Sequence, residues 1–210
     1  MNSTKINKSA IIVANGNFPT HSVPLNILEQ SKLIIACDGA ADTLIYKGIS
    51  PDIIIGDLDS ISQDNKIKYS DSIIKNEDQS QNDLRKAIYY AKNNNIKDIS
   101  IIGASGKRED HMIGNIFSLL DYRDLNIKLL TDTGVFICIH KNQKIDSFKG
   151  QQVSIFSPDP TIKITSSRLK YNFNNRAIST LYLGTLNESL SNVFEIKISH
   201  GIILIYQTYN

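Results

Sequence analysis

Short apolar runs alternate with amphipathic stretches along the first part of the chain. Apolar residues recur at helical spacing from Leu84 to Ala91 and from Ile113 to Leu120, so we expect helices there. Other runs are apolar almost throughout, which is typical of parallel strands buried on both faces. These predicted strands are Ala10–Ala14, Leu33–Cys37, Ile53–Ile55, Ile73–Ile74, Ile99–Gly103 and a run that ends at Leu129–Leu130. The alternation predicts an open, mostly parallel α/β sheet with right-handed crossovers.

The pattern changes after about Thr131. Short β-like runs follow, separated by Gly, Pro, Asn and Ser, and no long helix is predicted. These runs are Val135–His140, Gln152–Phe156, Thr161–Thr165, Val193–Ser199 and Ile202–Tyr206. The tripeptide Ser199-His200-Gly201 has the composition of a hairpin turn between the last two. We therefore predict two domains, an α/β domain over residues 1–132 and an all-β sandwich or barrel over residues 133–210.

Composition narrows the functional classes only slightly. The formal net charge is +2 and the charged residues are interspersed, so nucleic-acid binding and anionic-membrane binding have little support. The early apolar run Ala10–Ala14 is too short to span a bilayer and lacks the form of a signal peptide, so a cytoplasmic location is expected. Cys37 and Cys138 lie far apart inside apolar runs, which predicts buried free thiols and no disulfide framework or structural zinc site.

Two carboxylates follow one predicted strand directly. The strand Ile53–Ile55 ends in Gly56, and Asp57 and Asp59 come next with one residue between them. If the backbone stays extended, the two side chains project to the same side. Converging carboxylates are costly unless a cation neutralises them, and Mg²⁺ prefers oxygen ligands of this kind. The alternative is a solvated loop whose aspartates cap the next helix.

Two further aspartates lie where predicted elements meet. Asp38 follows the strand Leu33–Cys37 and is expected either to cap a helix or to face a ligand. Asp83 opens a predicted helix, and Ser80 and Asp83 have the spacing of a capping box. Lys86 lies one turn later on nearly the same face, where it could meet a phosphate or face solvent.

The segment Gly103–His111 joins the predicted strand Ile99–Gly103 to a helix. A glycine-rich turn before a helix offers backbone donors and a favourable dipole to a phosphate, and Arg108 adds a planar fork for phosphate oxygens. The segment lacks the complete P-loop pattern, and the chain has no G-x-G-x-x-G fingerprint. Asp110 could cap the helix, and His111 could be a packed histidine without a chemical role.

Five blocks of sequence together resemble the thiamine pyrophosphokinase family, in the family's order and spacing. They are VANGNFP (Val13–Pro19), CDGAAD (Cys37–Asp42), PDIIIGDLDSI (Pro51–Ile61), DQSQNDLRKAI (Asp78–Ile88) and GASGKREDHMIGNI (Gly103–Ile116). In the second half, Leu169-Lys170-Tyr171 and Ser191-Asn192 are similar to family segments that hold thiamine or precede the penultimate strand. Ser80, Asn82 and Lys107 depart from the residues usual in the family.

The resemblance implies an enzyme that uses ATP and Mg²⁺. Residues 1–132 would form the ATP- and magnesium-binding catalytic domain, and residues 133–210 a β-sandwich that binds thiamine. The thiamine hydroxyl would attack the β-phosphorus of ATP and release AMP. The resemblance also implies a homodimer with thiamine at the subunit interface.

The resemblance assigns roles to individual residues. The implied metal ligands are Asp57, Asp59 and Asp83. The implied catalytic set is these three with Arg108 and Asp110. The residues implied at ATP and its phosphates are Asp38, Gln79 and Arg108, and those implied at thiamine are Tyr171, Ser191 and Asn192. Lys107 stands where the family has Gly, and its charge beside Arg108 leads us to expect it at the ATP phosphates as well.

Three other functions are compatible with parts of the sequence. A pyrophosphokinase of a pterin alcohol would share most of the first domain. A metal-dependent nucleotide-sugar glycosyltransferase also uses an Asp-x-Asp element, but it leaves the segment Gly103–His111 and the β domain unexplained. A non-catalytic sensor of thiamine or nucleotide would bind ligand without releasing AMP.

Overall fold

The computed structural model describes residues 8–209, which form two compact units. The first unit contains the described residues up to Ser118 together with Asp124–Asp132. The second contains Leu119–Arg123 and the described residues from Thr133 onward. The two units are described separately.

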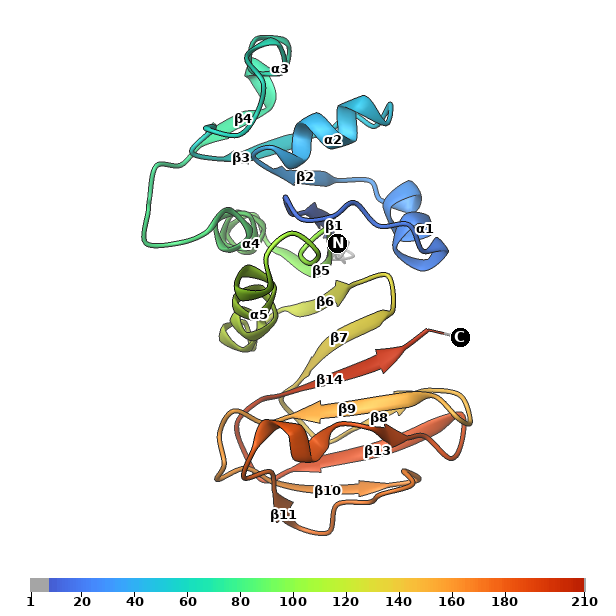
Figure 1. The fold of residues 1–210 in the computed structure, drawn as a ribbon. Coiled ribbons are helices and arrows are strands. Elements are labelled where there is room, and N and C mark those ends of the chain that lie inside the picture. The colour runs from blue at the N-terminus through green and yellow to red at the C-terminus, as the bar shows by residue number, and fades with distance from the viewer. Residues whose placement is uncertain (1–7, 210) are drawn as a thin grey trace, which may run out of the picture. The chain divides into compact units, whose positions relative to one another are not determined.

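The first unit is built on a six-stranded parallel sheet in the order β6-β5-β1-β2-β3-β4 (Figure 1). The strands are β1 (Lys8–Val13), β2 (Ile34–Cys37), β3 (Ile53–Gly56), β4 (Ile73–Lys75), β5 (Ile96–Ile102) and β6 (Asn126–Leu130). Isoleucines dominate the central strands, and those at positions 11, 12, 35, 54 and 101 are wholly buried. β-Branched side chains on both faces of a covered sheet favour this arrangement, and the predicted parallel α/β sheet is confirmed.

Five α-helices connect these strands. They are α1 (Ser22–Gln30), α2 (Ala40–Tyr46), α3 (Gln63–Lys68), α4 (Asp83–Asn93) and α5 (Glu109–Ser118), with a 3₁₀ turn η1 (Ser70–Ser72) after α3. Figure 1 shows α1 and α4 on opposite sides of the strands β1, β2 and β5. The predicted apolar stripe of α4 is buried at Leu84, Ala87, Ile88 and Ala91. No helix among residues 8–209 is long and apolar enough to cross a membrane.

The second unit is a β-sandwich. Its strands are β7 (Gly134–Ile139), β8 (Gln143–Asp146), β9 (Gln152–Phe156), β10 (Lys163–Ser167), β11 (Arg176–Ala177), β12 (Asn187–Glu188), β13 (Val193–Ile198) and β14 (Ile203–Thr208), with 3₁₀ turns η2 (Leu119–Asp121) and η3 (Leu181–Gly184). One sheet has the order β12-β9-β14-β7 and the other β11-β10-β13-β8, and all pairs within them are antiparallel. Side chains from both sheets, such as Ile155, Phe194 and Ile205, share one core. This confirms the predicted β-sandwich.

The predicted hairpin between the last two strands is wrong. β13 pairs with β8 and β10, whereas β14 pairs with β7 and β9, so the turn Ser199–Gly201 passes from one sheet to the other. Gly201 has a φ of +74°, which permits the reversal of chain direction that the sequence Ser199-His200-Gly201 predicts. A turn reverses the chain but does not decide which strands pair. Here both strands place apolar residues in the same core from opposite sides, and that burial decides the pairing.

Candidate active site

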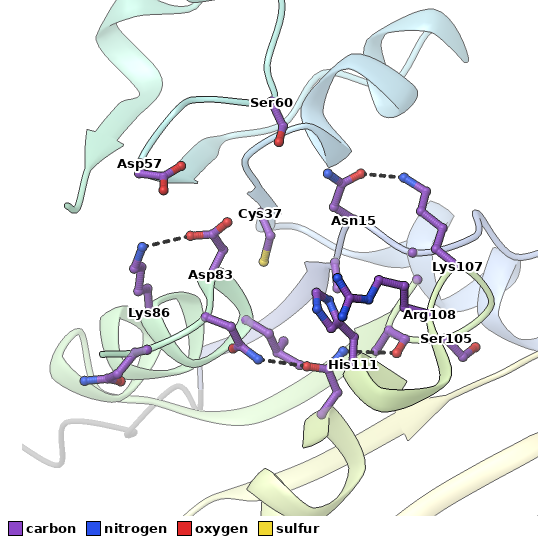
Figure 2. Close-up of a pocket in the computed structure, with 18 of the residues that line it drawn as sticks. Asn15, Cys37, Asp57, Ser60, Asp83, Lys86, Ser105, Lys107, Arg108 and His111 are labelled. Atoms are coloured by element: carbon purple, nitrogen blue, oxygen red, sulfur yellow. Dashed lines mark hydrogen bonds and ion pairs between the residues drawn. The ribbon is translucent and has the colours of Figure 1, made fainter. Parts of the chain in front are cut away.

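The loops at the carboxyl ends of β1, β2, β3 and β5 surround a pocket in the first unit, together with the start of α4. Parallel strands bring their carboxyl ends to one edge of the sheet, which is where ligands bind in such folds. The cavity has a volume of about 430 Å³. Figure 2 shows Asp57, Asp83 and Lys86 on one side of it and Lys107, Arg108 and His111 on the other.

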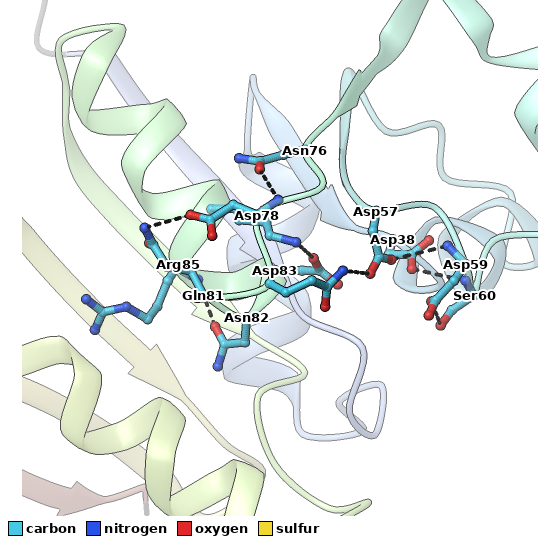
Figure 3. A network of polar contacts seen from close by, with 12 residues as sticks. Asp38, Asp57, Asp59, Ser60, Asn76, Asp78, Gln81, Asn82, Asp83 and Arg85 are labelled. Carbon is cyan, nitrogen blue, oxygen red and sulfur yellow. Dashed lines mark hydrogen bonds and ion pairs between the residues drawn. The ribbon is translucent and has the colours of Figure 1, made fainter.

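Three carboxylates form an acidic cluster after β2 and β3. One oxygen each from Asp38, Asp57 and Asp59 lies within 4.8 Å of the others (Figure 3). The extended backbone expected between Asp57 and Asp59 is not found, because Leu58 has a left-handed φ of +70°. The backbone N–H of Asp59 instead turns back and donates to Asp57 Oδ1 over 3.3 Å. Three hard oxygen donors at this spacing suit a small divalent cation such as Mg²⁺.

Asp38 is the buried member of the cluster, with 1% of its surface exposed. Its side chain does not cap α2, whose N-cap residue is Gly39. The two carboxylate oxygens accept the backbone N–H groups of Ser60 and Ile61, each over 3.0 Å. Burial raises the pKa of Asp38, in opposition to these hydrogen bonds. Asp38 therefore ties the end of β2 to the loop that carries Asp57 and Asp59.

Gln79 contacts the cluster from the segment that precedes α4. Its Nε2 donates to Asp57 Oδ2 over 3.1 Å. This hydrogen bond is the main reason that the pKa of Asp57 lies below its ordinary value. The structure thus brings together two of the residues selected from the sequence, Gln79 and Asp57, and their hydrogen bond favours the ionised form of the carboxylate.

Asp83 is the first residue of α4, but the predicted capping box is wrong. The N-cap residue is Asn82, whose side chain accepts the N–H of Arg85 over 3.0 Å, and the Ser80 hydroxyl donates to Asp78. The carboxylate of Asp83 lines the pocket and accepts from Lys86 Nζ over 3.0 Å. Only 3% of the Lys86 side chain is exposed, so this ammonium group is buried beside the pocket.

Gly56 separates the acidic cluster from this ion pair. A Cβ atom at Gly56 would lie 2.8 Å from the Cβ of Asp38 and 3.3 Å from the carboxyl carbon of Asp83. The absence of a side chain at Gly56 therefore leaves space for the side chains of both Asp38 and Asp83. Among residues 8–209, Asp83 is not part of the three-carboxylate cluster.

The loop after β5 supplies cationic side chains. Lys107 Nζ donates to Asn15 Oδ1 over 2.9 Å, and Arg108 donates to both oxygens of Asp110 over 3.0 and 2.6 Å. The guanidinium lowers the pKa of Asp110 to about 2. α5 begins at Glu109, so Asp110 lies inside the helix and is not its cap. Asp110 instead orients the guanidinium of Arg108.

Backbone contacts fix the cationic loop against the loop after β1. The N–H of Gly16 donates to the carbonyl of Gly103 over 2.6 Å, and the N–H of Asn17 donates to that of Ser105 over 2.8 Å. A Cβ atom at Gly16 would lie 2.3 Å from the Gly103 oxygen. Only glycine permits so close an approach of two backbones.

Sequence reasoning did not select several residues that line the pocket. For Lys86 the sequence predicts only that it meets a phosphate or faces solvent, whereas its side chain is buried against Asp83, which lies one turn earlier on the helix. Asn82 donates to Asn115 over 3.1 Å, and Asn115 donates to the carbonyl of Ala104 over 3.1 Å, which links α4 and α5 to the loop after β5. No pattern in the sequence indicated Asn115, because its contacts join segments far apart in the chain.

The residues selected for thiamine lie in the second unit. Tyr171 has 63% of its surface exposed, and the buried Asn187 side chain binds its backbone N–H and carbonyl over 3.0 and 2.8 Å. The Ser191 hydroxyl donates to the carbonyl of Val193 over 2.6 Å. Asn192 is exposed, and its carbonyl accepts the N–H of Ser147 over 2.9 Å.

Two family models match consecutive parts of the chain. Residues 25–131 match the model described as "Thiamin pyrophosphokinase, catalytic domain". Residues 134–206 match the model described as "Thiamin pyrophosphokinase, substrate-binding domain". Together the two matches extend over most of both units.

Curated proteins of the same description are similar over most of their length. "Thiamine pyrophosphokinase 2" of Arabidopsis thaliana is 29% identical over 197 residues, which cover 79% of this chain and 73% of that protein. "Thiamine pyrophosphokinase" of Bacillus subtilis is 27% identical over 215 residues, which cover 96% of this chain and 99% of that protein.

Solved structures share the fold. The crystal structure of thiamine pyrophosphokinase from Bacillus subtilis aligns with a TM-score of 0.81 at 22% identity, over 97% of this chain and 100% of that one. Thiamin pyrophosphokinase from Candida albicans aligns with a TM-score of 0.80 at 20% identity, over 96% of this chain and 90% of that one.

Proposed function

Because the chain belongs to the thiamin pyrophosphokinase family, we propose that its acidic pocket transfers a diphosphate group from ATP to thiamine. The oxygen of the thiamine hydroxyl forms a bond to the β-phosphorus of ATP. The bond from that phosphorus to the oxygen bridging it to the α-phosphate breaks, and AMP leaves. The observation that carries this proposal is one pocket with carboxylates at one side and Lys107 and Arg108 at the other.

The carboxylates suit a magnesium ion. Asp57 and Asp59 would hold it, and the spacing favours Asp38 as the third carboxylate in place of Asp83, which is paired with Lys86. When bound, Mg²⁺ would offset the negative charge that develops on the phosphate groups during transfer. Gln79 would keep the Asp57 carboxylate oriented for this role.

Cationic side chains would hold the phosphates in line for the transfer. Lys107 and Arg108 offer donors from the loop after β5, and Arg108 has a fork that matches phosphate oxygens. The salt bridge to Asp110 limits the orientations of that fork before ATP arrives. Lys86 adds a buried positive charge next to Asp83, where water screens it little. Holding reactants in this way supplies much of the rate enhancement in phosphoryl transfer.

The β-sandwich would supply thiamine contacts and a dimer interface. The exposed ring of Tyr171 suits the cationic thiazolium, and Ser191 and Asn192 lie in the same unit. The nearby segment Leu181–Leu186 exposes Tyr182 at 72% and Leu186 at 82%, which is unusual for apolar side chains left in solvent. We propose that this segment is covered in a homodimer. The cytoplasmic location and the absence of nucleic-acid partners stay predictions.

The reaction is tested by measuring AMP and thiamine diphosphate formed from ATP, Mg²⁺ and thiamine. We expect Asp59→Asn to lower kcat by about 100-fold, because removal of a metal ligand or electrostatic stabiliser has effects of this order. Asp64→Asn is the matched control, since the exposed Asp64 carboxylate lies on α3 and binds no other residue of 8–209. The control should retain wild-type kcat.

Other outcomes point elsewhere. Thiamine binding without AMP would indicate a sensor. Turnover of a pterin alcohol without turnover of thiamine would indicate a different pyrophosphokinase. Equal kcat for wild type and Asp59→Asn would mean that Asp59 is not a ligand of the catalytic metal ion.

A further inference from the structure

Asp42 in the first turn of α2 binds the segment that follows the acidic cluster. Its Oδ2 accepts the backbone N–H of Ser62 over 2.8 Å. Its Oδ1 accepts the Ser62 hydroxyl over 2.9 Å and Asn65 Nδ2 over 2.6 Å. One side chain from α2 thus receives three donors from the start of α3. Asp42 is not among the residues that line the pocket.

Asp42 and Asp38 act on neighbouring positions of one segment. Asp38 accepts the N–H groups of Ser60 and Ile61, and Asp42 accepts that of Ser62, so three consecutive amides are bound by two carboxylates of one short stretch. Ile61 lies between them with 3% of its surface exposed, which anchors the segment to the core as well. Charge-assisted hydrogen bonds of this kind are about twice as strong as neutral ones.

The bound segment determines where Asp59 lies. The Ser60 hydroxyl donates to Asp59 Oδ1 over 2.8 Å (Figure 3). Leu58 is held at a φ of +70°, a backbone conformation that is strained in a residue other than glycine. A loop with this strain keeps its shape only if both of its ends are fixed. β3 fixes one end, and the clamp from Asp38 and Asp42 fixes the other.

Stabilising α3 alone does not explain the three bonds to Asp42. α3 has six residues and buries none of them, so its position contributes little to the core. Its N-cap residue Ser62 makes no capping bond of its own, because its hydroxyl is directed to Asp42. The segment fixed by Asp42 leads back instead to Ser60 and Asp59.

We propose that Asp42 is a positioning residue, which sets the geometry of the Asp57–Asp59 cation site through the segment Ser60–Ser62. This inference rests on the proposed function, because it requires a divalent cation at that cluster. Residues that orient metal ligands typically change metal affinity by about 10- to 100-fold when removed. Asp42 acts through the backbone, so a loss at the lower end, about tenfold, is expected.

The test measures Mn²⁺ binding to the full chain by the electron paramagnetic resonance signal of free Mn²⁺, without substrates. Asp42→Ala should weaken Mn²⁺ binding by about tenfold relative to wild type. Asp64→Ala controls for the loss of a nearby charge on α3. Asp132→Ala controls for lost hydrogen bonds, since Asp132 also accepts three donors, from Thr20 and His21, elsewhere in the first unit. Both controls should bind Mn²⁺ as wild type does.

A second variant separates geometry from charge. Asn65→Ala removes one hydrogen bond to Asp42 and leaves the net charge unchanged. It should also weaken Mn²⁺ binding, and combining it with Asp42→Ala should add little further loss, because both changes release the same segment. The thermal midpoints of all variants are recorded to identify any that do not fold.

Two results would overturn the inference about Asp42 and leave the proposed function standing. One is wild-type Mn²⁺ affinity in folded Asp42→Ala and Asn65→Ala. The other is an equal loss of affinity in Asp132→Ala, which would mean that any destabilisation of the unit weakens the site. Wild-type protein that binds no Mn²⁺ would instead overturn the metal site of the proposed function, and this inference with it.

Discussion

At the scale of single residues, the pocket depends on how closely the backbone of Gly56 approaches the side chains of Asp38 and Asp83. Gly56 has the acidic cluster on one side and the Asp83–Lys86 pair on the other, and it leaves no space for a methyl group. Its backbone is not in the left-handed region, so the need for glycine here comes from the neighbouring carboxylates and not from φ. This position is a sensitive place to test the site.

Gly56→Ala is expected to displace Asp38 or Asp83 and to lower the free energy of unfolding by about 1–3 kcal/mol, the usual cost of overpacking. The rate of AMP formation should fall by more than the loss of folded protein accounts for, because Asp38 and Asp83 both belong to the proposed site. Urea unfolding and the AMP assay measure the two effects. Gly114→Ala is the matched control, since Gly114 lies in α5 with no atom within 4 Å of an added Cβ. Unchanged activity in Gly56→Ala would contradict the crowding argument.

Lys86 is the second residue with a testable role. Lys86→Met is expected to lower the stability by about 1–3 kcal/mol, because it leaves Asp83 without its cation in a partly buried place. The double variant Asp83→Asn/Lys86→Met should recover part of that loss, since no charge is then left unpaired. Urea unfolding of the two single variants and the double variant gives the coupling. Strict additivity would mean that the ion pair does not couple the two residues.

At the scale of elements, a carboxylate far along the chain anchors the beginning of α1. Asp132 follows β6 and accepts the N–H and hydroxyl of Thr20 and the N–H of His21, the N-cap residue of α1. Partial burial acts to raise the pKa of Asp132, but these hydrogen bonds prevail and lower it. The contact therefore couples two segments 112 residues apart in the sequence.

Asp132→Ala is expected to cost about 1 kcal/mol of stability at pH 7, as the loss of a helix cap does. A carboxyl whose pKa is lowered by folding contributes stability that is complete above its unfolded pKa of about 3.9. That contribution is lost as the pH falls through the lower folded value. The difference between wild type and variant in urea should therefore shrink as the pH falls below about 4. A difference independent of pH would show that the carboxylate charge is not involved.

Two of the elements that sequence reasoning missed have weak periodicity. β8 (Gln143–Asp146) buries only Ile145, and α3 buries nothing, so neither carries the apolar pattern that marks an element. The strands of the parallel sheet were predictable because their isoleucines are buried on both faces. The pairing of β13 and β14 was not, because two strands that share a core and a turn can lie in one sheet or in two.

At the scale of the whole molecule, the change from mixed helix and strand to strand alone predicted both architectures. The parallel arrangement also explains why the aspartates after β2 and β3 meet, because parallel strands end at one edge of the sheet. The detail of the site was not predictable in the same way. The left-handed turn at Leu58, the clamp from Asp42 and the link through Asn115 depend on contacts between distant segments, which no local pattern encodes.

The sulfur atom at the end of β2 has a chemical consequence for the pocket. Cys37 lines the cavity, yet only 2% of its surface is exposed, and burial beside Asp83 and Asp38 raises the pKa of its thiol. The thiolate is the form that reacts with oxidants and electrophiles, and here it is almost absent at neutral pH. The cavity can therefore contain sulfur and still react only slowly with oxidants and alkylating reagents.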